Sequence, residues 1–375
     1  MARGTSNPMT EKKAIRLEAA PDNTSRRGFL GMCALSGAGA AAALGGCASA
    51  KTAELATTRR VKFCVFADIH YNPGVCPHAS KEWLGRILER AEKENVDFII
   101  HCGDFCHHPA RDKDYVNFYN DFHLPTYHVI GNHDDDGNSH AETLEAYRLK
   151  SGHYFFDRNG YRFIVTDPNY VKYADGRVEH YSNGNYYKKK PGGLISYVPP
   201  EQLEWLKETI GSSPYPCVVF SHQSFERGYG SSCSNPEEVR RIFDAANAAN
   251  PGRVPFVING HSHCDFVRVL EQIVYMEVNS ANFQWLGSKF NHSSYPEEFC
   301  RNVSSAPHIA TVNDPLSAIV TLDGSGLIDV DGMKSSFYMG ISPKQMGYKG
   351  EVHRPFTSDI QSFAMRLMSP RRDNA

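Results

Sequence analysis

The sequence predicts an α/β fold with helices packed on mixed β-sheets, and three observations lead to this prediction. Apolar strand-like runs alternate with helix-like segments along residues 61–259, which is typical of a layered α/β domain. The later runs at 273–279 and 317–332 resemble antiparallel strands, which indicates a mixed sheet or a second sheet. The chain has 375 residues, of which 41% are hydrophobic and 22% charged, enough for a large core.

The expected elements follow one another in a regular order. Runs rich in β-branched and aromatic residues predict strands at 61–67, 96–102, 125–130, 217–221 and 255–259. Apolar residues at helical spacing predict helices at 81–95, 115–122, 200–210 and 236–250. Between them, residues 153–167 are expected to form a hairpin that turns at Asn159-Gly160.

A polar stretch at 168–199 is expected to be a surface insertion. It contains Tyr186 and Tyr187, followed by three lysines at 188–190. The lysines could contact a phosphate, although a solvated loop is the favoured interpretation. The net charge of the whole chain is only −2, which gives no support to a nucleic-acid partner.

Residues 1–50 are expected to be an export signal and not part of the fold. Arg26-Arg27 precede Gly-Phe-Leu and a charge-free stretch rich in Gly and Ala, which resembles a twin-arginine signal. A transmembrane anchor is the alternative, but Gly and Ala make this stretch weakly hydrophobic. We expect a polar linker at 51–60, the main folded domain at 61–335, and a C-terminal tail packed on the domain at 336–375.

Two short patterns suggest how the signal is released. Residues 44–47 resemble a lipobox, which would attach a lipid to Cys47, whereas residues 48–50 form an A-x-A site for ordinary cleavage. We favour the lipoprotein. In either case the protein is expected in the periplasm or cell envelope, with membrane contact only through the signal or the lipid.

Cysteines after the signal number eight, and their positions suggest two groups. Cys64, Cys102 and Cys217 lie in apolar strand-like runs and are expected to be buried. Outside the cytoplasm some of the others could pair, and the best disulfide candidates are the loop residues Cys76, Cys106, Cys233 and Cys300. Their connectivity cannot be derived from the sequence.

Five of the strand-like runs end in residues that can bind a metal ion. Open α/β sheets collect ligand sites at the carboxyl ends of their strands, so one crevice could contain them all. The side chains offer carboxylate, amide and imidazole ligands without a thiolate, and they are too many for one ion. They suit two ions that share a ligand. The residues in question are Asp68, His70, Asp104, Asn132, His133, Asp134, His222, His261 and His263.

The ordered series D-x-H, G-D, G-N-H-D, H and G-H-x-H resembles the signature of the calcineurin-like metallophosphoesterases over about residues 61–265. The resemblance implies a four-layer α/β/β/α sandwich, in which two mixed sheets pack face to face between helices. It implies one ion held by Asp68, His70 and His263, and a second held by Asn132, His222 and His261. Asp104 would bridge the two ions.

The same resemblance implies two candidate catalytic residues. His133 would stabilise charge on the phosphoryl group or protonate the leaving oxygen. Asp134 would orient a neighbour or cap its loop, with a direct catalytic role as the less favoured alternative. His107 stands where the purple acid phosphatases of this family have a tyrosine. His107 and His108 could contact substrate, or could equally be solvated.

The predicted function is an exported dinuclear-metal phosphohydrolase, in which a hydroxide bridging the ions hydrolyses small phosphomonoesters or phosphodiesters. The ions could be manganese, iron, zinc, cobalt, nickel or magnesium. A nucleotide pyrophosphohydrolase or a cyclic-nucleotide phosphodiesterase is the alternative, since the D-x-H opening resembles the branch with class III cyclic-nucleotide phosphodiesterases. A catalytically silent exported binding lipoprotein is a third, which the complete ligand set disfavours. The oligomeric state stays open.

Overall fold

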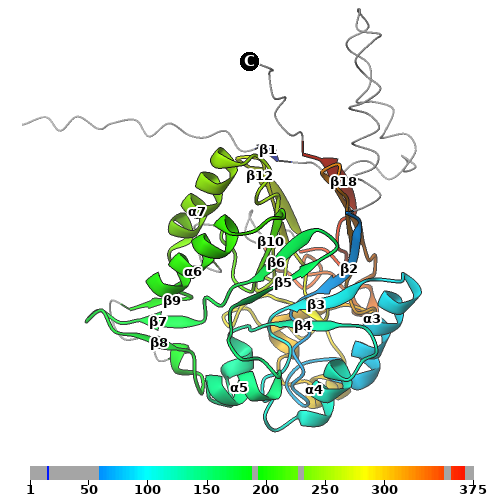
Figure 1. The fold of residues 1–375 in the computed structure, drawn as a ribbon. Helices are drawn as coiled ribbons and strands as arrows, with labels where there is room; N and C mark the ends of the chain where they lie inside the picture. Colours follow the sequence, from blue (N-terminus) through cyan, green and yellow to red (C-terminus); the bar gives the residue numbers. More distant parts are fainter. Residues whose placement is uncertain (1–14, 17–58, 188–192, 227–231, 350–355, 368–375) are drawn as a thin grey trace, which may run out of the picture.

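The computed structural model describes residues 15–16, 59–187, 193–226, 232–349 and 356–367 (Figure 1). The expected export signal with Cys47, most of the linker and the three lysines at 188–190 lie outside the described residues, apart from the short strand β1 (Ile15–Arg16). Within the described part of the chain, no helix is both long and apolar enough to cross a bilayer.

The larger of two central sheets has seven strands and is mixed. Its middle strands β6, β10, β11 and β13 run parallel, while β5, β12 and β1 add antiparallel edges. Parallel neighbours direct their carboxyl ends to one side of the sheet, where ligands collect. In spatial order the strands are β1 (Ile15–Arg16), β12 (Phe266–Leu270), β13 (Ile273–Glu277), β11 (Phe256–Asn259), β10 (Cys217–Ser221), β6 (Tyr161–Val165) and β5 (Tyr154–Arg158).

The second central sheet has six strands and is also mixed. Strands β2, β3 and β4 are parallel, and β16, β17 and β18 are antiparallel additions. Since β18 pairs with β17, part of the C-terminal tail completes the sheet as an edge strand. In spatial order the strands are β18 (Phe363–Arg366), β17 (Leu327–Gly332), β16 (Ala318–Leu322), β2 (Val61–Phe66), β3 (Phe98–Cys102) and β4 (Thr126–Val129).

Aromatic rings fill the space between the two sheets. Phe98 of the smaller sheet packs edge-on against Phe163 of the larger sheet, with ring centroids 4.9 Å apart. Phe63 likewise meets Phe163 at 5.7 Å and Phe220 at 5.8 Å. All four side chains are fully buried. The sheets therefore pack face to face and bury a common core.

Helices cover the outer face of each sheet (Figure 1). Helices α6 (Pro200–Gly211) and α7 (Pro236–Ala249) contribute Leu206 and Phe243 to an apolar cluster on the larger sheet. Helices α3 (Lys81–Lys93) and α4 (Lys113–Asn120) cover the smaller sheet, where Leu84 and Tyr119 are fully buried. The four-layer α/β/β/α sandwich is confirmed.

The described residues of the insertion, 168–187 and 193–199, form secondary structure. They contain a three-stranded sheet and a short 3₁₀ helix, and the rings of Tyr181 and Tyr186 are buried against each other. The bounds are β7 (Tyr170–Lys172), β8 (Val178–His180), β9 (Leu194–Ile195) and η2 (Asn185–Tyr187). The remaining elements are η1 (His133–Asp135), α5 (His140–Ala146), β14 (Phe283–Trp285), α8 (Glu297–Asn302), η3 (Ala306–His308), β15 (Ile309–Thr311) and η4 (Tyr338–Gly340).

The eight cysteines of the described residues form no disulfide bond. Of the loop residues expected to pair, Cys76, Cys106 and Cys233 are buried separately, and Cys300 is half-buried. The expectation of disulfides is therefore wrong for this structure, because these loops fold inward and the thiols pack as small apolar groups.

Candidate dinuclear metal site

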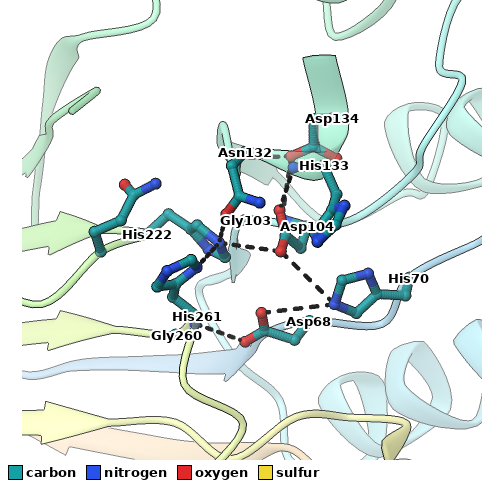
Figure 2. Close-up of polar contacts among 12 residues, drawn as sticks. Asp68, His70, Gly103, Asp104, Asn132, His133, Asp134, His222, Gly260 and His261 are labelled. Atoms are coloured by element: carbon teal, nitrogen blue, oxygen red, sulfur yellow. Dashed lines mark hydrogen bonds and ion pairs between the residues drawn. The ribbon is translucent and has the colours of Figure 1, made fainter. Parts of the chain in front are cut away.

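Seven candidate metal ligands lie together where strands of both sheets end, and Figure 2 labels all of them except His263. From the smaller sheet, Asp68 and His70 follow β2, Asp104 follows β3, and Asn132 follows β4. From the larger sheet, His222 follows β10, and His261 and His263 follow β11. The face-to-face packing of the sheets thus brings all seven together at the carboxyl ends of the strands.

The first group of ligand atoms comes from Asp68, His70 and His263. Nε2 of His263 lies 3.4 Å and Nε2 of His70 lies 3.9 Å from Oδ1 of Asp68, and the two nitrogens are 3.0 Å apart. Two atoms bound to one ion at about 2.0–2.2 Å are separated by roughly this much. These three side chains therefore form a pocket suited to one ion.

The second group comes from Asn132, His222 and His261. Nε2 of His222 lies 3.2 Å from Oδ1 of Asn132 and 3.1 Å from Nδ1 of His261. Oδ2 of Asp104 lies 3.2 Å from Nε2 of His222 and 3.6 Å from Nε2 of His70. A single carboxylate oxygen therefore faces both pockets, as a bridging ligand must.

The atoms of these residues that face away from the pockets are held by hydrogen bonds. Nδ1 of His222 donates to the carbonyl of Cys102 at 2.7 Å, and Nδ1 of His263 donates to the carbonyl of Phe283 at 2.6 Å. These bonds orient both rings and direct Nε2 of each toward its pocket.

The carboxylates are oriented in the same way. Oδ1 of Asp104 accepts the backbone N–H of His133 at 2.8 Å, and Oδ2 of Asp68 accepts that of His261 at 2.9 Å. Oδ1 of Asp68 is buried with no hydrogen-bond partner. A buried carboxylate oxygen left unpaired is costly. Its position toward the first pocket therefore fits a cation.

Five of the seven candidate ligands have a left-handed backbone, which non-glycine residues rarely adopt. Such residues cost on the order of 1–3 kcal/mol each and persist where the surrounding fold imposes them. They allow side chains that follow straight strands to turn back toward the strand ends. The φ angles are +54° at Asp68, +48° at His70, +52° at Asp104, +78° at His261 and +51° at His263.

At two positions next to these ligands, neighbouring atoms lie so close to the backbone that only glycine fits. A Cβ atom at Gly103 would lie 2.3 Å from Nδ1 of His222, and φ there is +89°. A Cβ atom at Gly260 would lie 2.6 Å from Oδ2 of Asp68. Any side chain at either position would displace a candidate ligand, so glycine sets how closely the strands converge.

The charges of the site suit cation binding. Burial raises the pKa of Asp104, but the neighbouring charges of His222 and His133 outweigh it and hold that pKa well below its usual range. Burial also lowers the pKa of His70 and His261 well below that of free histidine. At His222 burial lowers the pKa, but the charge of Asp104 outweighs it and raises the pKa to about 9, so an ion that binds there displaces a proton from this ring.

Beside the pockets lies a hydrogen-bonded group of side chains that we call the outer edge: His107, His133, Asp136, Tyr186 and Tyr187. Oδ2 of Asp136 lies 2.6 Å from Nδ1 of His133 and 3.3 Å from Nδ1 of His107. Burial lowers the pKa of His133, but the charges of Asp104 and Asp136 raise it to about 9. The hydroxyl of Tyr187 lies 3.1 Å from Nδ1 of His133.

Tyr186 connects the outer edge to the second pocket. Its hydroxyl donates to Oδ1 of Asp136 at 2.7 Å and accepts from Nδ2 of Asn132 at 3.0 Å. The second bond directs the amide nitrogen of Asn132 away from the pocket and leaves its oxygen facing His222. The insertion therefore takes part in orienting a candidate ligand.

Asp134 does not face the pockets. Its buried carboxylate accepts the backbone N–H groups of Phe105 at 2.8 Å, Cys106 at 2.9 Å and Gly131 at 2.7 Å, and the hydroxyl of Tyr147 at 2.7 Å. Its place in the structure fits the role of orienting neighbours: it ties the loop that carries Asp104 to the loop that carries Asn132. A direct catalytic role has no geometric support.

The sequence interpretation did not identify Asp136, Tyr186 or Tyr187 as parts of the site. A signal for Asp136 was present in the run of three aspartates at 134–136, of which only one was considered. The two tyrosines stood out as aromatic residues in a polar insertion. Their contact with His133 depends on how the insertion folds back, which local sequence does not reveal.

Comparisons with known proteins identify a family and a similar fold. A family model described as calcineurin-like phosphoesterase matches residues 61–265. A dimetal phosphatase from Danio rerio aligns with a TM-score of 0.51 at 15% identity, over 74% of this chain and 98% of its own. GAP50, the anchor in the inner membrane complex of Plasmodium, aligns with a TM-score of 0.48 at 14% identity, over 83% of this chain and 90% of its own. No curated protein sequence matches significantly.

Proposed function

The chain belongs to the calcineurin-like phosphoesterase family and is a metal-dependent phosphoester hydrolase, and from this premise we propose that it is an exported enzyme for small phosphomonoesters or phosphodiesters. The observation that carries the proposal is the pair of pockets sharing Oδ2 of Asp104. Two ions bound there would supply a water of lowered pKa and positive charge for the phosphoryl oxygens.

The chain's own residues hold the substrate relative to that centre. Because Nδ1 of His133 is bound to Asp136, the opposite nitrogen, Nε2, is left to contact the phosphoryl group or the leaving oxygen. A proton delivered there would let the alcohol depart without a full negative charge. Asp136 acts through His133 and is therefore a positioning residue.

Tyr187 suits a role in recognition of the leaving group. Its side chain is 60% exposed although its hydroxyl reaches His133, so its ring forms a wall at the open side of the outer edge. Such a ring can pack against an organic group attached to the phosphate. The nucleoside part of a nucleotide pyrophosphate or of a cyclic nucleotide could pack against the same ring. These two compound classes are therefore the alternative substrates.

A substrate panel tests the activity. Metal-free protein is reconstituted with Mn²⁺, Zn²⁺, Fe²⁺, Co²⁺, Ni²⁺ or Mg²⁺ and assayed with p-nitrophenyl phosphate, bis-p-nitrophenyl phosphate, cyclic AMP and ADP-ribose. We expect metal-dependent hydrolysis of at least one compound, and much slower hydrolysis in His133→Asn. If the wild-type protein binds two ions but hydrolyses none of the four, the catalytically silent binding protein becomes the better interpretation.

Export and lipidation are part of the proposal and need their own experiment. The motifs at 25–50 support them, with Cys47 as the lipidation site. Expressed in a bacterium with the twin-arginine pathway, the full chain should appear in the cell-envelope fraction. Cys47→Ala should move it to the soluble periplasmic fraction, and Arg26→Lys combined with Arg27→Lys should retain it in the cytoplasm. Unchanged fractionation of all variants would contradict the assignment.

A further inference from the structure

A second group of metal-capable side chains lies beneath the insertion, apart from the seven candidate ligands. It consists of His140, Asp167 and His180, which we call the Asp167 triad. His140 begins α5, Asp167 follows β6, and His180 ends β8 of the insertion. Asp167 is fully buried, and His140 is nearly so.

The triad brings two imidazole nitrogens close to one carboxylate oxygen without a hydrogen bond between them. Oδ2 of Asp167 lies 3.7 Å from Nε2 of His140 and 3.8 Å from Nδ1 of His180. These distances are too long for hydrogen bonds but match the ligand separations of the two pockets. Both Oδ2 of Asp167 and Nδ1 of His180 are buried without a hydrogen-bond partner.

The opposite atoms of the triad are held firmly. Oδ1 of Asp167 accepts the backbone N–H of Asn169 at 3.0 Å and its side-chain amide at 2.8 Å. Nδ1 of His140 lies 3.1 Å from Oδ2 of Asp135, which is the carboxylate–histidine arrangement that orients metal-bound imidazoles. Gly152 makes room, since a Cβ there would lie 2.2 Å from Oδ2 of Asp167.

The charges around the triad attract a cation. Asp135 and Asp167 lie on opposite sides of the His140 ring. Burial lowers the pKa of His140, but the hydrogen bond with Asp135 and the charge of Asp167 outweigh it and raise that pKa.

We propose that the Asp167 triad binds a third divalent cation through Nε2 of His140, Oδ2 of Asp167 and Nδ1 of His180. Two imidazoles and one carboxylate suit Zn²⁺ or another first-row divalent ion, with water completing the shell. The rings of His140 and His180 stack with centroids 3.8 Å apart. Binding therefore requires the half-buried His180 ring to tilt so that its lone pair points at the ion.

This third ion would fasten the insertion to the loop of the outer edge. His180 belongs to the same insertion as Tyr186 and Tyr187, and Asp135 precedes Asp136 in the loop of His133. The site is thus a structural one, placed so that it stabilises the position of side chains near the substrate. The inference does not depend on the hydrolytic activity.

Metal titration tests the third site directly. Metal-free full-length protein is titrated with Zn²⁺ by calorimetry, and bound zinc is counted after gel filtration. We expect three equivalents in the wild type and two in His180→Ala. In an Asp104→Asn background, which disables the two pockets, we expect one equivalent, and none after His180→Ala is added. Zn²⁺ should also raise the melting temperature of Asp104→Asn but not that of the double variant.

Two further variants make the result decisive. His180→Cys keeps a zinc ligand and should restore the third equivalent, whereas His123→Ala removes an exposed histidine on another surface and should change nothing. Circular dichroism of the metal-free proteins shows whether each variant folds. Equal zinc content in Asp104→Asn and in Asp104→Asn combined with His180→Ala overturns the proposal, as does a wild-type protein that binds only two equivalents.

Discussion

The two metal pockets and the outer edge lie side by side but are held in different ways. The ligands of the pockets follow strands directly, and five of them have a left-handed backbone imposed by the packing of the two sheets. The outer edge instead depends on hydrogen bonds between side chains of a loop and of the insertion. The backbone thus sets the positions of the candidate metal ligands, whereas side-chain hydrogen bonds set the positions of the outer-edge residues.

This difference predicts that substitutions in the pockets abolish activity, whereas substitutions at the outer edge reduce it by degrees. The expected loss of activity in each variant follows from the number of ions or reacting groups that its side chain contacts. Asp104 faces both pockets, His133 lies beside them, Asp136 orients His133, and the hydroxyl of Tyr187 reaches His133 and Asp136.

Asp104→Asn should have the largest effect. A neutral amide cannot replace an anionic bridge, so we expect both pockets to lose their ions and kcat/KM to fall by about a thousandfold or more. Metal analysis and steady-state kinetics measure the two effects. Asp114→Asn, on the exposed face of α4, is the matched control. Wild-type metal content in Asp104→Asn would show that Asp104 is no bridge.

His133→Asn should lower kcat by about a hundredfold to a thousandfold, because general acid catalysis typically contributes this much. The metal content should stay that of the wild type, since His133 is not among the ligands assigned to either pocket. Measuring kcat and bound metal on the same preparation distinguishes an effect on catalysis from an effect on metal binding. If the variant loses a bound ion as well as its activity, His133 is a metal ligand and not a residue of the outer edge alone.

Asp136→Asn should reduce kcat by about tenfold to a hundredfold, as is typical for a residue that orients another. Burial lowers the pKa of His133, and the charges of Asp104 and Asp136 raise it. Removing Asp136 should therefore lower this pKa, so activity that requires protonated His133 is lost at a lower pH. A pH profile of kcat with its alkaline limb shifted to lower pH tests this sign. A uniform loss without a shift would indicate a merely structural role.

Tyr187→Phe should have the smallest effect, since it removes only the hydroxyl of a largely exposed side chain, which reaches His133 and Asp136. We expect kcat to fall by less than about fivefold, consistent with a hydrogen bond of about 1 kcal/mol. Tyr187→Ala should raise KM more for substrates with an aromatic leaving group than for those with a small aliphatic one. If KM changes equally for both substrate types, Tyr187 does not recognise the leaving group.

The sequence indicated which candidate ligands lie close together, because their signals are local. Asp68, Asp104 and His222 each follow an apolar run, and parallel strands bring such positions to one edge without further information. The family resemblance then supplied the division into two groups. The strands and helices of the sandwich were predictable for the same reason: their hydrophobic periods match the surfaces they bury.

The outer edge and the Asp167 triad were not predictable because their residues meet through tertiary contacts. Asp134 and Asp136 are two residues apart in a single acidic run, yet one binds backbone amides and the other binds His133. Which carboxylate faces the site depends on the 3₁₀ turn between them. His140, Asp167 and His180 lie on three separate elements that the sequence interpretation did not connect.

The hydrogen bond from the backbone of His261 to Asp68 joins residues 193 positions apart. Bringing such distant segments together costs considerable chain entropy, and contacts of this kind form slowly. A nascent chain that ends before β11 therefore lacks two ligands and cannot assemble either pocket. We expect the ions to bind only after both sheets have formed, so that metal mainly slows the unfolding of the finished protein rather than starting its folding.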